Sequence, residues 1–350
     1  MILHRTIIAS LVASMILFCV VSASTTCSAA DTKTIRVGVI GVDGPHPFMF
    51  SQHMNDPKAT DARVGVTVVA AYVGGSDDVP SSVKYRKEYV KKVQDLGIEI
   101  VPTIEALLTK VDAVMIESLD GRIHRSEAKK VIAAGKPLFI DKPLAGSLAD
   151  CVEIAQAAKR AGVPWFSASS LRYSEGVAAI GDGKNDKVGK IRGCDAWGPN
   201  HPLEPHSMPD LFYYGIHGTE ILFTIMGPGC KTVARAHSDD GGLPDGTDVV
   251  VGVWDDGRIG TYRSASGFGA TVFGSKGVVP SGGWSGYEPL VVVIAEFFKT
   301  GKAPISPEEI LEVYAFLAAA DVSKSKGGCP VSIEAVLNED AKKTGVNSAK

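Results

Sequence analysis

The sequence has no overall excess of basic residues. Its 36 Lys and Arg residues are outnumbered by 39 Asp and Glu residues, which gives a formal net charge of -3. Nucleic-acid-binding proteins neutralise phosphates with clustered Lys and Arg, so we expect no nucleic-acid partner. The length of 350 residues, with 45% hydrophobic and 21% charged residues, indicates about two globular domains.

The six cysteines include no C-x-x-C pair, the spacing that is typical of zinc sites. A proline-rich loop carries His201, Glu204 and His206, but this spacing fits no helix or hairpin ligand motif. The sequence therefore predicts no metal site. Whether any of the cysteines form disulfides stays undecided at this point, because pairing cannot be read from sequence. The four cysteines beyond the N-terminal segment are Cys151, Cys194, Cys230 and Cys329.

The N-terminal segment lacks a twin-arginine pair and a full-length membrane span. An apolar run over residues 7–21 follows His4 and Arg5, and it is shorter than the ~20 residues that cross a bilayer. Small residues follow it and end at Ala30. We predict a signal peptide over residues 1–30 and export to the periplasm or the cell exterior, with no stable membrane insertion after cleavage. A single membrane anchor is the alternative.

Residues 33–167 alternate short β-branched runs with amphipathic stretches, a pattern typical of parallel βαβ units with helices on both faces. Glycine ends two of the predicted helices, in AAGKP and RAGVP, and a strand follows each proline. The predicted strands are 35–40, 66–73, 113–116, 138–140 and 163–166, and the predicted helices are 82–96, 104–110, 122–134 and 148–161.

The pattern changes after residue 170. A long apolar helix is predicted over residues 210–226, and SPEE at 306–309 is typical of a helix start. The strands predicted between them are 232–237, 248–253, 258–264 and 270–273, joined by Gly- and Asp-rich turns that favour an antiparallel sheet. We therefore expect a Rossmann-type dinucleotide-binding domain at 33–167, a substrate and oligomerisation domain at 168–337 and a flexible tail at 338–350.

The turn GVIGVDGPHP, residues 38–47, lacks two glycines of the dinucleotide fingerprint G-x-G-x-x-G. Counted from Gly41, the pattern requires glycine where Asp43 and His46 stand. A carboxylate ~4 Å from a phosphate costs about 1 to 4 kcal/mol. The acidic residue that binds the ribose, ~20 residues further on, is also missing from the end of the second strand. The turn still lies where a pyrophosphate meets a helix N-terminus, so we predict that Gly38, Gly41, Asp43, Gly44 and His46 bind the cofactor.

A lysine followed by proline stands directly after a buried strand in GKPLFIDKPLAGS, residues 135–147. This position is the carboxyl end of a parallel sheet, where such folds bind ligands. Together with VDAVMIESLDGRIH, residues 111–124, the stretch resembles the family of glucose–fructose oxidoreductase, inositol dehydrogenase and rhizopine-catabolism proteins. The hallmark of that family is Glu-Lys-Pro, and this chain has Asp141-Lys142-Pro143 in its place. The resemblance implies a functional Lys142, flanked by cofactor-binding Asp141 and Pro143.

The second half supports the same resemblance. The family carries Asp-x-x-x-His on a helix, with the histidine as acid or base beside a substrate hydroxyl, and DLFYYGIHGTEILFTIMG places His217 there. Tyr213 stands in place of the aspartate, and Glu220 follows three residues after the histidine. The resemblance implies that Lys142 and His217 are catalytic. The predicted substrate-binding residues are His124, Arg172, Tyr213 and Glu220, with an interdomain salt bridge as the alternative for Arg172.

The resemblance extends over about residues 33–335. It implies an α/β fold with a Rossmann-type parallel sheet and a C-terminal α/β domain whose sheet is open, and association into homo-oligomers. It also implies a tightly bound NAD or NADP and a small carbohydrate or polyol substrate, oxidised by hydride transfer. Two alternatives stay open. One is a redox-silent carbohydrate-binding protein, and the other is a redox-neutral glycosidase or lyase that uses NAD transiently.

Overall fold

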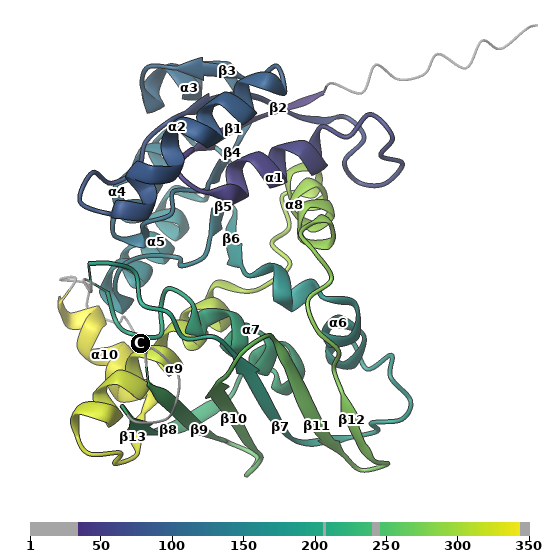
Figure 1. The fold of residues 1–350 in the computed structure, drawn as a ribbon, viewed down its shortest axis with the longest axis vertical. Coiled ribbons are helices and arrows are strands. Elements are labelled where there is room, and N and C mark those ends of the chain that lie inside the picture. Colours follow the sequence, from purple (N-terminus) through teal and green to yellow (C-terminus); the bar gives the residue numbers. More distant parts are fainter. Residues whose placement is uncertain (1–33, 206–207, 240–245, 344–350) are drawn as a thin grey trace, which may run out of the picture. The chain divides into compact units, whose positions relative to one another are not determined.

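The computed structural model describes residues 34–205, 208–239 and 246–343. The predicted signal peptide, His206 and residues 344–350 lie outside these ranges. Two sheets organise the described chain (Figure 1). The α/β fold class is confirmed, with a parallel Rossmann-type sheet followed by a mixed sheet.

The first sheet has six strands in the order β3-β2-β1-β4-β5-β6, and all its pairings are parallel. This is the strand order of dinucleotide-binding folds, in which ligands bind beyond the carboxyl ends of the strands. The strands are β1 (Ile35–Ile40), β2 (Val66–Tyr72), β3 (Glu99–Val101), β4 (Ala113–Ile116), β5 (Leu138–Asp141) and β6 (Trp165–Ala168).

Helices connect these strands, and local signals fix several of their ends. Ser147 caps α5 by accepting a hydrogen bond from the Asp150 N–H, and Gly162 ends it in the left-handed region with φ 65°. The short β3 was not predicted, because its three residues carry too little pattern. The helices are α1 (Pro45–Met54), α2 (Pro80–Asp95), α3 (Ile104–Lys110), α4 (Gly121–Ala133) and α5 (Leu148–Ala161).

The second sheet has seven strands in the order β12-β11-β7-β10-β9-β8-β13. Helices α7 (Gly215–Met226) and α9 (Pro307–Ser325) pack on this sheet. The prediction of a mostly antiparallel sheet is confirmed, although β7 and β10 run parallel. The strands are β7 (Ile191–Gly198), β8 (Cys230–Ser238), β9 (Thr247–Trp254), β10 (Ile259–Ser264), β11 (Gly269–Gly274), β12 (Val278–Pro280) and β13 (Val331–Ser332).

Several predicted boundaries in this half are wrong. The helix predicted from residue 210 begins at Gly215, after a turn. The tail predicted from residue 338 is helical as far as Lys343. Strand β7 was missed, because its sequence IRGCDAWG contains two glycines and an aspartate, residue types that are depleted in strands. The remaining elements are η1 (Ser170–Tyr173), α6 (Glu175–Gly181), α8 (Glu288–Thr300) and α10 (Ile333–Lys343).

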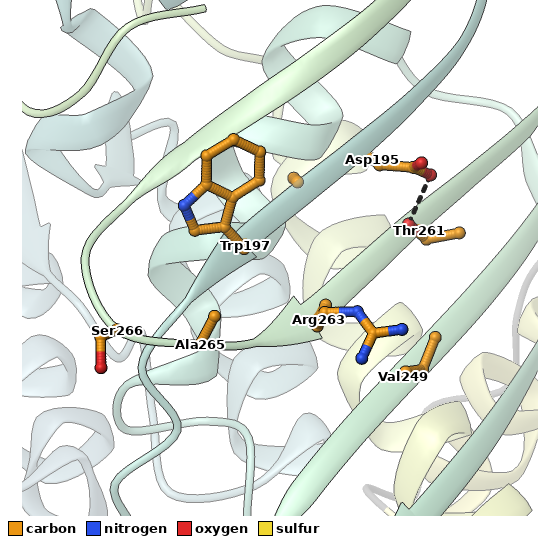
Figure 2. A pocket seen from close by; sticks show the side chains of 8 residues that line it. Asp195, Trp197, Val249, Thr261, Arg263, Ala265 and Ser266 are labelled. Carbon is orange, nitrogen blue, oxygen red and sulfur yellow. Dashed lines mark hydrogen bonds between the residues drawn. The ribbon is translucent and has the colours of Figure 1, made fainter. Parts of the chain in front are cut away.

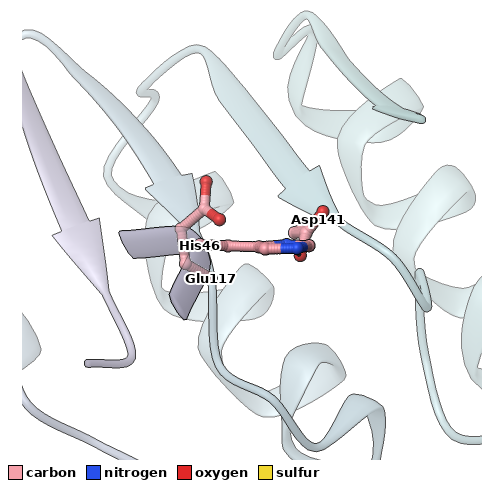
Figure 3. A group of neighbouring side chains, drawn as sticks. All are labelled: His46, Glu117 and Asp141. Atoms are coloured by element: carbon pink, nitrogen blue, oxygen red, sulfur yellow. The ribbon is translucent and has the colours of Figure 1, made fainter. Parts of the chain in front are cut away.

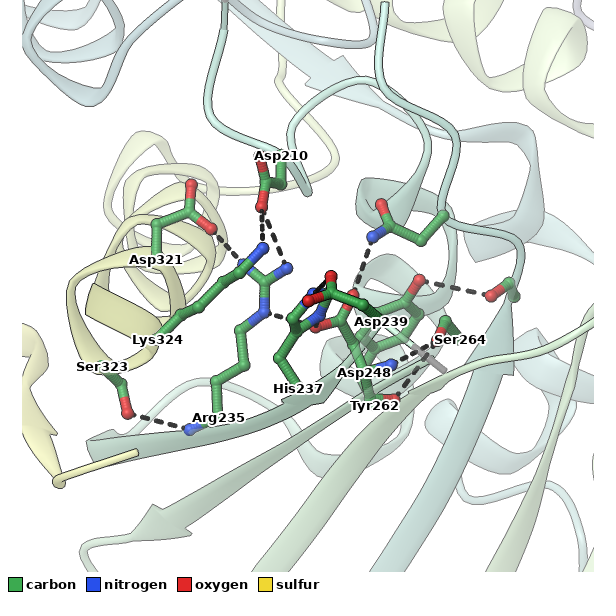
Figure 4. Close-up of polar contacts among 12 residues, drawn as sticks. Asp210, Arg235, His237, Asp239, Asp248, Tyr262, Ser264, Asp321, Ser323 and Lys324 are labelled. Atoms are coloured by element: carbon green, nitrogen blue, oxygen red, sulfur yellow. Dashed lines mark hydrogen bonds and ion pairs between the residues drawn. The ribbon is translucent and has the colours of Figure 1, made fainter. Parts of the chain in front are cut away.

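A buried arginine joins α9 to the second sheet. Arg235 of β8 is 1% exposed, and its guanidinium forms ion pairs with Asp248 of β9, Asp321 of α9 and Asp210 (Figure 4). The Arg235 N–H also donates to the Ser323 hydroxyl, 2.9 Å away. Asp248 accepts from Arg235 Nε at 2.7 Å, so this buried charge is both paired and hydrogen-bonded. The network holds α9 in a fixed position against the sheet.

All four cysteines of the described residues are free, and three of them are buried. Within the same residues, no helix is long and apolar enough to cross a membrane.

Candidate functional site

The candidate site lies at the carboxyl ends of the first sheet, where Lys142 directly follows β5. The Lys142 Nζ lies over the rings of Tyr213 and Tyr214, 5.1 Å and 5.3 Å from their centroids. Burial lowers the pKa of Lys142, while the charges of Asp141 and Glu117 oppose that shift. No ion pair joins Lys142 to a carboxylate in the described part of the chain.

His217 reaches the same site from the first turn of α7 and is 8% exposed. Its Nδ1 lies 2.6 Å from the Ser169 hydroxyl, which takes the place of the partner carboxylate expected for a catalytic histidine. Burial, followed by the charges of Lys142 and His46, holds the pKa of His217 well below its usual value. The imidazole is therefore neutral at neutral pH, and Nε2 is the ring nitrogen left for a ligand.

Lys142 and His217 line one cavity of about 140 Å³. A second cavity of about 120 Å³ shares Lys142, His46, Tyr214 and Tyr287 with the first. Trp284 and Phe268 complete the first cavity with aromatic faces. Small ligand sites combine apolar walls with a few polar groups, and this cavity, which contains both residues predicted to be catalytic, has that composition.

Three further side chains lie close together (Figure 3), and they line the second cavity with Lys142. His46 comes from the first turn of α1, Glu117 follows β4, and Asp141 ends β5. His46 Nδ1 lies 2.5 Å from Asp141 Oδ2. The pKa of Asp141 is lowered by His46 although burial opposes this shift, and burial next to Asp141 raises the pKa of Glu117 well above its usual value. Sequence reasoning missed Glu117, although it follows a predicted strand just as Lys142 does.

The side chain of Asp43 is fully buried and does not project from the β1–α1 turn. Its Oδ2 accepts from the Ser82 hydroxyl at 2.5 Å, and its Oδ1 accepts from the Leu119 N–H at 3.0 Å. Burial raises the pKa of Asp43. The repulsion expected between this carboxylate and a phosphate is thus reduced, because the group is bonded into the protein.

The turn retains part of what a dinucleotide needs. Gly41 has φ +90°, and a Cβ there would lie 2.3 Å from the Ser118 nitrogen, so only glycine fits. Gly44 is the N-cap of α1. Among the described residues, the N–H groups of Gly44 and His46 find no acceptor, while prolines at 45 and 47 supply no N–H. The turn fits one phosphate at the helix N-terminus, with fewer donors than a full fingerprint.

Most of the other residues predicted to bind cofactor or substrate lie neither in the β1–α1 turn nor in the walls of the two small cavities. Gly38 sits within β1, where a Cβ would lie 3.0 Å from Leu107, so it serves packing. Pro143 packs near Gly121. His124 is fully buried and its Nε2 lies 2.7 Å from the Ser118 carbonyl oxygen. Of the predicted substrate-binding residues, Tyr213 alone lines a cavity described above.

Arg172 and Glu220 form an ion pair with each other and do not line either of the two small cavities. Arg172 Nε lies 2.5 Å from Glu220 Oε2, and Arg172 Nη1 lies 2.7 Å from Glu309 Oε1. Arg172 is 8% exposed and Glu220 is 4% exposed. Arg172 therefore forms a salt bridge that links η1 to α7 and α9, but all three residues lie within the predicted domain 168–337, so this bridge is not the interdomain one that stood as the alternative.

A larger cavity, of about 430 Å³, lies on the second sheet (Figure 2). Trp197 and Arg263 line it, and Asp195 accepts a hydrogen bond from Thr261 at 2.7 Å. It contains none of the residues that the sequence predicted for the site. Size alone therefore does not locate the candidate chemistry.

Comparison with known families agrees with this geometry. Residues 35–169 match the sequence model of an oxidoreductase family described as having an NAD-binding Rossmann fold, the family of glucose–fructose oxidoreductase and inositol dehydrogenase. Over these residues, which form its first sheet and the helices that connect the strands, the chain is similar to this oxidoreductase family. The matched residues contain the β1–α1 turn, Glu117, Asp141 and Lys142, and they stop before His217.

Relatives in the oxidoreductase family include inositol 2-dehydrogenase of Klebsiella pneumoniae, 29% identical over 148 residues. The alignment covers 42% of this chain and 40% of that enzyme. Among solved structures, scyllo-inositol dehydrogenase of Lactobacillus casei with bound NAD(H) and scyllo-inositol has a TM-score of 0.67 at 14% identity, covering 86% of this chain and 100% of that one. An oxidoreductase of Thermotoga maritima has a TM-score of 0.68 at 14% identity, covering 87% and 99%. These similarities extend the fold to the second sheet.

Proposed function

We propose that the protein is an NAD(P)-dependent oxidoreductase that oxidises a hydroxyl group of a small carbohydrate or polyol. The observation that carries this proposal is the meeting of Lys142 and His217 at one small, aromatic-lined cavity. The cavity lies at the carboxyl edge of a sheet whose family binds NAD. The relatives named as inositol dehydrogenases support a polyol as the class of substrate.

The chain's own residues divide the work. The Lys142 ammonium donates a hydrogen bond to the reacting hydroxyl oxygen, and His217 Nε2 accepts the hydroxyl proton. Ser169 fixes the His217 ring through Nδ1. Tyr214, Trp284 and Tyr287 present faces and edges to the C–H groups of a sugar ring. Bound NAD(P) supplies the hydride acceptor, and the donors of the β1–α1 turn hold its phosphate.

The test is whether the purified protein carries and uses a nicotinamide. Nucleotide released on denaturation is separated by chromatography, and NAD(P)H absorbance is followed with a panel of polyols and monosaccharides. We expect Lys142→Met and His217→Asn each to lower kcat/KM by at least about a hundredfold, whereas the exposed variant Glu88→Gln leaves it unchanged. Sugar binding by calorimetry without bound nucleotide or turnover would favour the redox-silent alternative.

We also propose that the protein is exported. The support is the short apolar run followed by small residues at 1–30. Free nicotinamide nucleotide is scarce outside the cytoplasm, so an exported oxidoreductase retains its cofactor and recycles it on a second substrate.

Self-association is proposed through the open face of the second sheet. Its strands expose apolar side chains, with Val253 37%, Ile259 54%, Phe273 39% and Val278 62% accessible. Light scattering of the purified protein tests this proposal, and Ile259→Lys should shift an oligomer toward the monomer.

A further inference from the structure

The cluster beside Lys142 contains a buried carboxylate with no hydrogen-bond partner. Glu117 is 2% exposed, and neither of its carboxylate oxygens has a partner. Burying an unpaired polar group costs free energy unless something binds it. Glu117 is among the residues that line the cavity of about 120 Å³, a space large enough for a cation and a water molecule.

Two other ligand types face the same space. His46 and Asp141 line this cavity with Glu117, and one ligand atom from each residue lies within 4.8 Å of those of the other two. Cations bound by nitrogen and oxygen lie about 2.0 to 2.2 Å from each ligand atom, so ligand atoms around one ion are about 3 to 4 Å apart. A shift of about 1 Å brings the three side chains to that spacing.

The fold holds these ligands in place. Glu117 and Asp141 follow neighbouring strands, since β4 pairs with β5, and the Glu117 N–H donates to the Ile40 carbonyl of β1. The His46 ring stacks on the Phe50 ring, with 5.2 Å between the ring centroids, and packs edge-on with the Tyr287 ring, with 4.9 Å between the centroids. Packing therefore limits the movement of the imidazole.

Lys142 does not supply the missing partner of Glu117. Its ammonium lies over the Tyr213 and Tyr214 rings, and among the described residues no ion pair joins it to Glu117 or Asp141. The simpler explanation, a structural ion pair, accounts for His46 and Asp141 but leaves Glu117 unexplained.

We propose that His46, Glu117 and Asp141 bind a divalent first-row cation of the Zn²⁺ or Mn²⁺ class, with open positions facing the cavity that Lys142 lines. One imidazole and two carboxylates suit such borderline and hard cations, and three protein ligands leave room for water or a substrate oxygen. This proposal differs from the prediction made from the sequence, which placed no metal site in the protein. It goes beyond the proposed oxidoreductase function and does not depend on it.

The test measures cation binding in the absence of nucleotide and sugar. The full chain is treated with EDTA, dialysed and titrated with ZnCl₂ and with MnCl₂ by calorimetry, and electron paramagnetic resonance follows bound Mn²⁺. We expect one ion per chain with a dissociation constant on the order of micromolar or lower for at least one cation. Removing a group that only hydrogen-bonds to a metal ligand lowers metal affinity about 10- to 100-fold. Glu117 and Asp141 are proposed as direct ligands, so Glu117→Gln and Asp141→Asn should each lower the affinity at least about a hundredfold.

A matched control separates the site from general effects of replacing a buried acidic side chain. Glu127→Gln also removes a carboxylate that is 5% exposed, but this residue lies outside the cluster and bonds to Ser118, so it should bind the cation within threefold of wild type. Circular dichroism checks that each variant folds. Absence of micromolar binding in the wild type, or binding that Glu117→Gln leaves unchanged, would overturn the proposal. Nucleotide content and turnover decide the oxidoreductase function separately.

Discussion

Glu127 gives the stability of the protein a defined dependence on pH. This α4 residue is 5% exposed, and both carboxylate oxygens lie 3.0 Å from the Ser118 hydroxyl. Burial raises its pKa from 4.5 to about 8, with smaller contributions from the charges of Asp43 and Asp120. The folded protein therefore holds a proton that the unfolded chain releases near pH 4.5.

The direction of the effect follows from linkage. A group whose pKa is raised by folding makes its full contribution to stability at pH values below its unfolded-state pKa. For Glu127 this contribution is lost as the pH rises to about 8. With these two pKa values, the loss between pH 5 and pH 8 is about 3.5 kcal/mol. Glu127→Gln keeps the shape of the side chain and cannot ionise, so the variant escapes the loss.

Urea unfolding at pH 5, 6, 7 and 8 measures the difference in unfolding free energy between Glu127→Gln and wild type. We expect the variant to gain relative to wild type by about 3 to 4 kcal/mol across this range. Glu88→Gln, at an exposed position of α2, should show a difference that stays within about 0.5 kcal/mol. A constant difference for Glu127→Gln would mean that the carboxyl ionises normally in the folded protein, and the reasoning would be refuted.

Four further predictions concern other parts of the molecule. Ser169→Ala should lower kcat about tenfold or more, because it removes the hydroxyl that orients His217, and it should lower the unfolding free energy by about 0.5 to 2 kcal/mol, because the same hydroxyl caps η1 by accepting from the Leu171 N–H; unchanged kinetics would argue against the orienting role. Asp43→Gly should lower stability by about 1 to 3 kcal/mol through loss of two hydrogen bonds, and calorimetry should show NADH affinity within about threefold of wild type; a large gain in affinity would mean that the carboxylate faces the phosphate. Arg172→Met should cost about 3 to 5 kcal/mol in urea unfolding, since it leaves two carboxylates without their cation; a loss under 1 kcal/mol would show that the bridge contributes little. Mass spectrometry of the exported protein should find a mature chain that starts near Asp31, and an intact Met1 would contradict the signal peptide.

Local sequence determined the elements of the first sheet. Strands β1, β2, β4 and β5 follow short β-branched runs, and α5 begins and ends at residues with their own capping signals, Ser147 and Gly162. Such signals act over a few residues, so they can be read from the sequence without knowing which strands or helices pack together. The place of Lys142 followed from the same reasoning, because the residue after a buried parallel strand lies at the ligand-binding edge.

Strand β7 was decided by the tertiary structure, because its own sequence carries little strand pattern. β7 pairs with β10 and β11, although its own residue pattern did not predict a strand. The direction of Asp43 was likewise fixed by Ser82 and Leu119, which are 39 and 76 residues away. A sequence shows that a carboxylate is present, but only packing shows which donors it meets.

The candidate site shows the same division. Sequence pattern and family resemblance selected Lys142 and His217, which do share a cavity. They also offered Arg172 and Glu220 for substrate, and the fold pairs these two with each other. Glu117 was overlooked, because its meaning depends on His46 and Asp141 arriving from other elements. A side chain's type is written in the chain, whereas its pKa and its partners depend on burial and on neighbours that only the folded chain brings within a few ångströms.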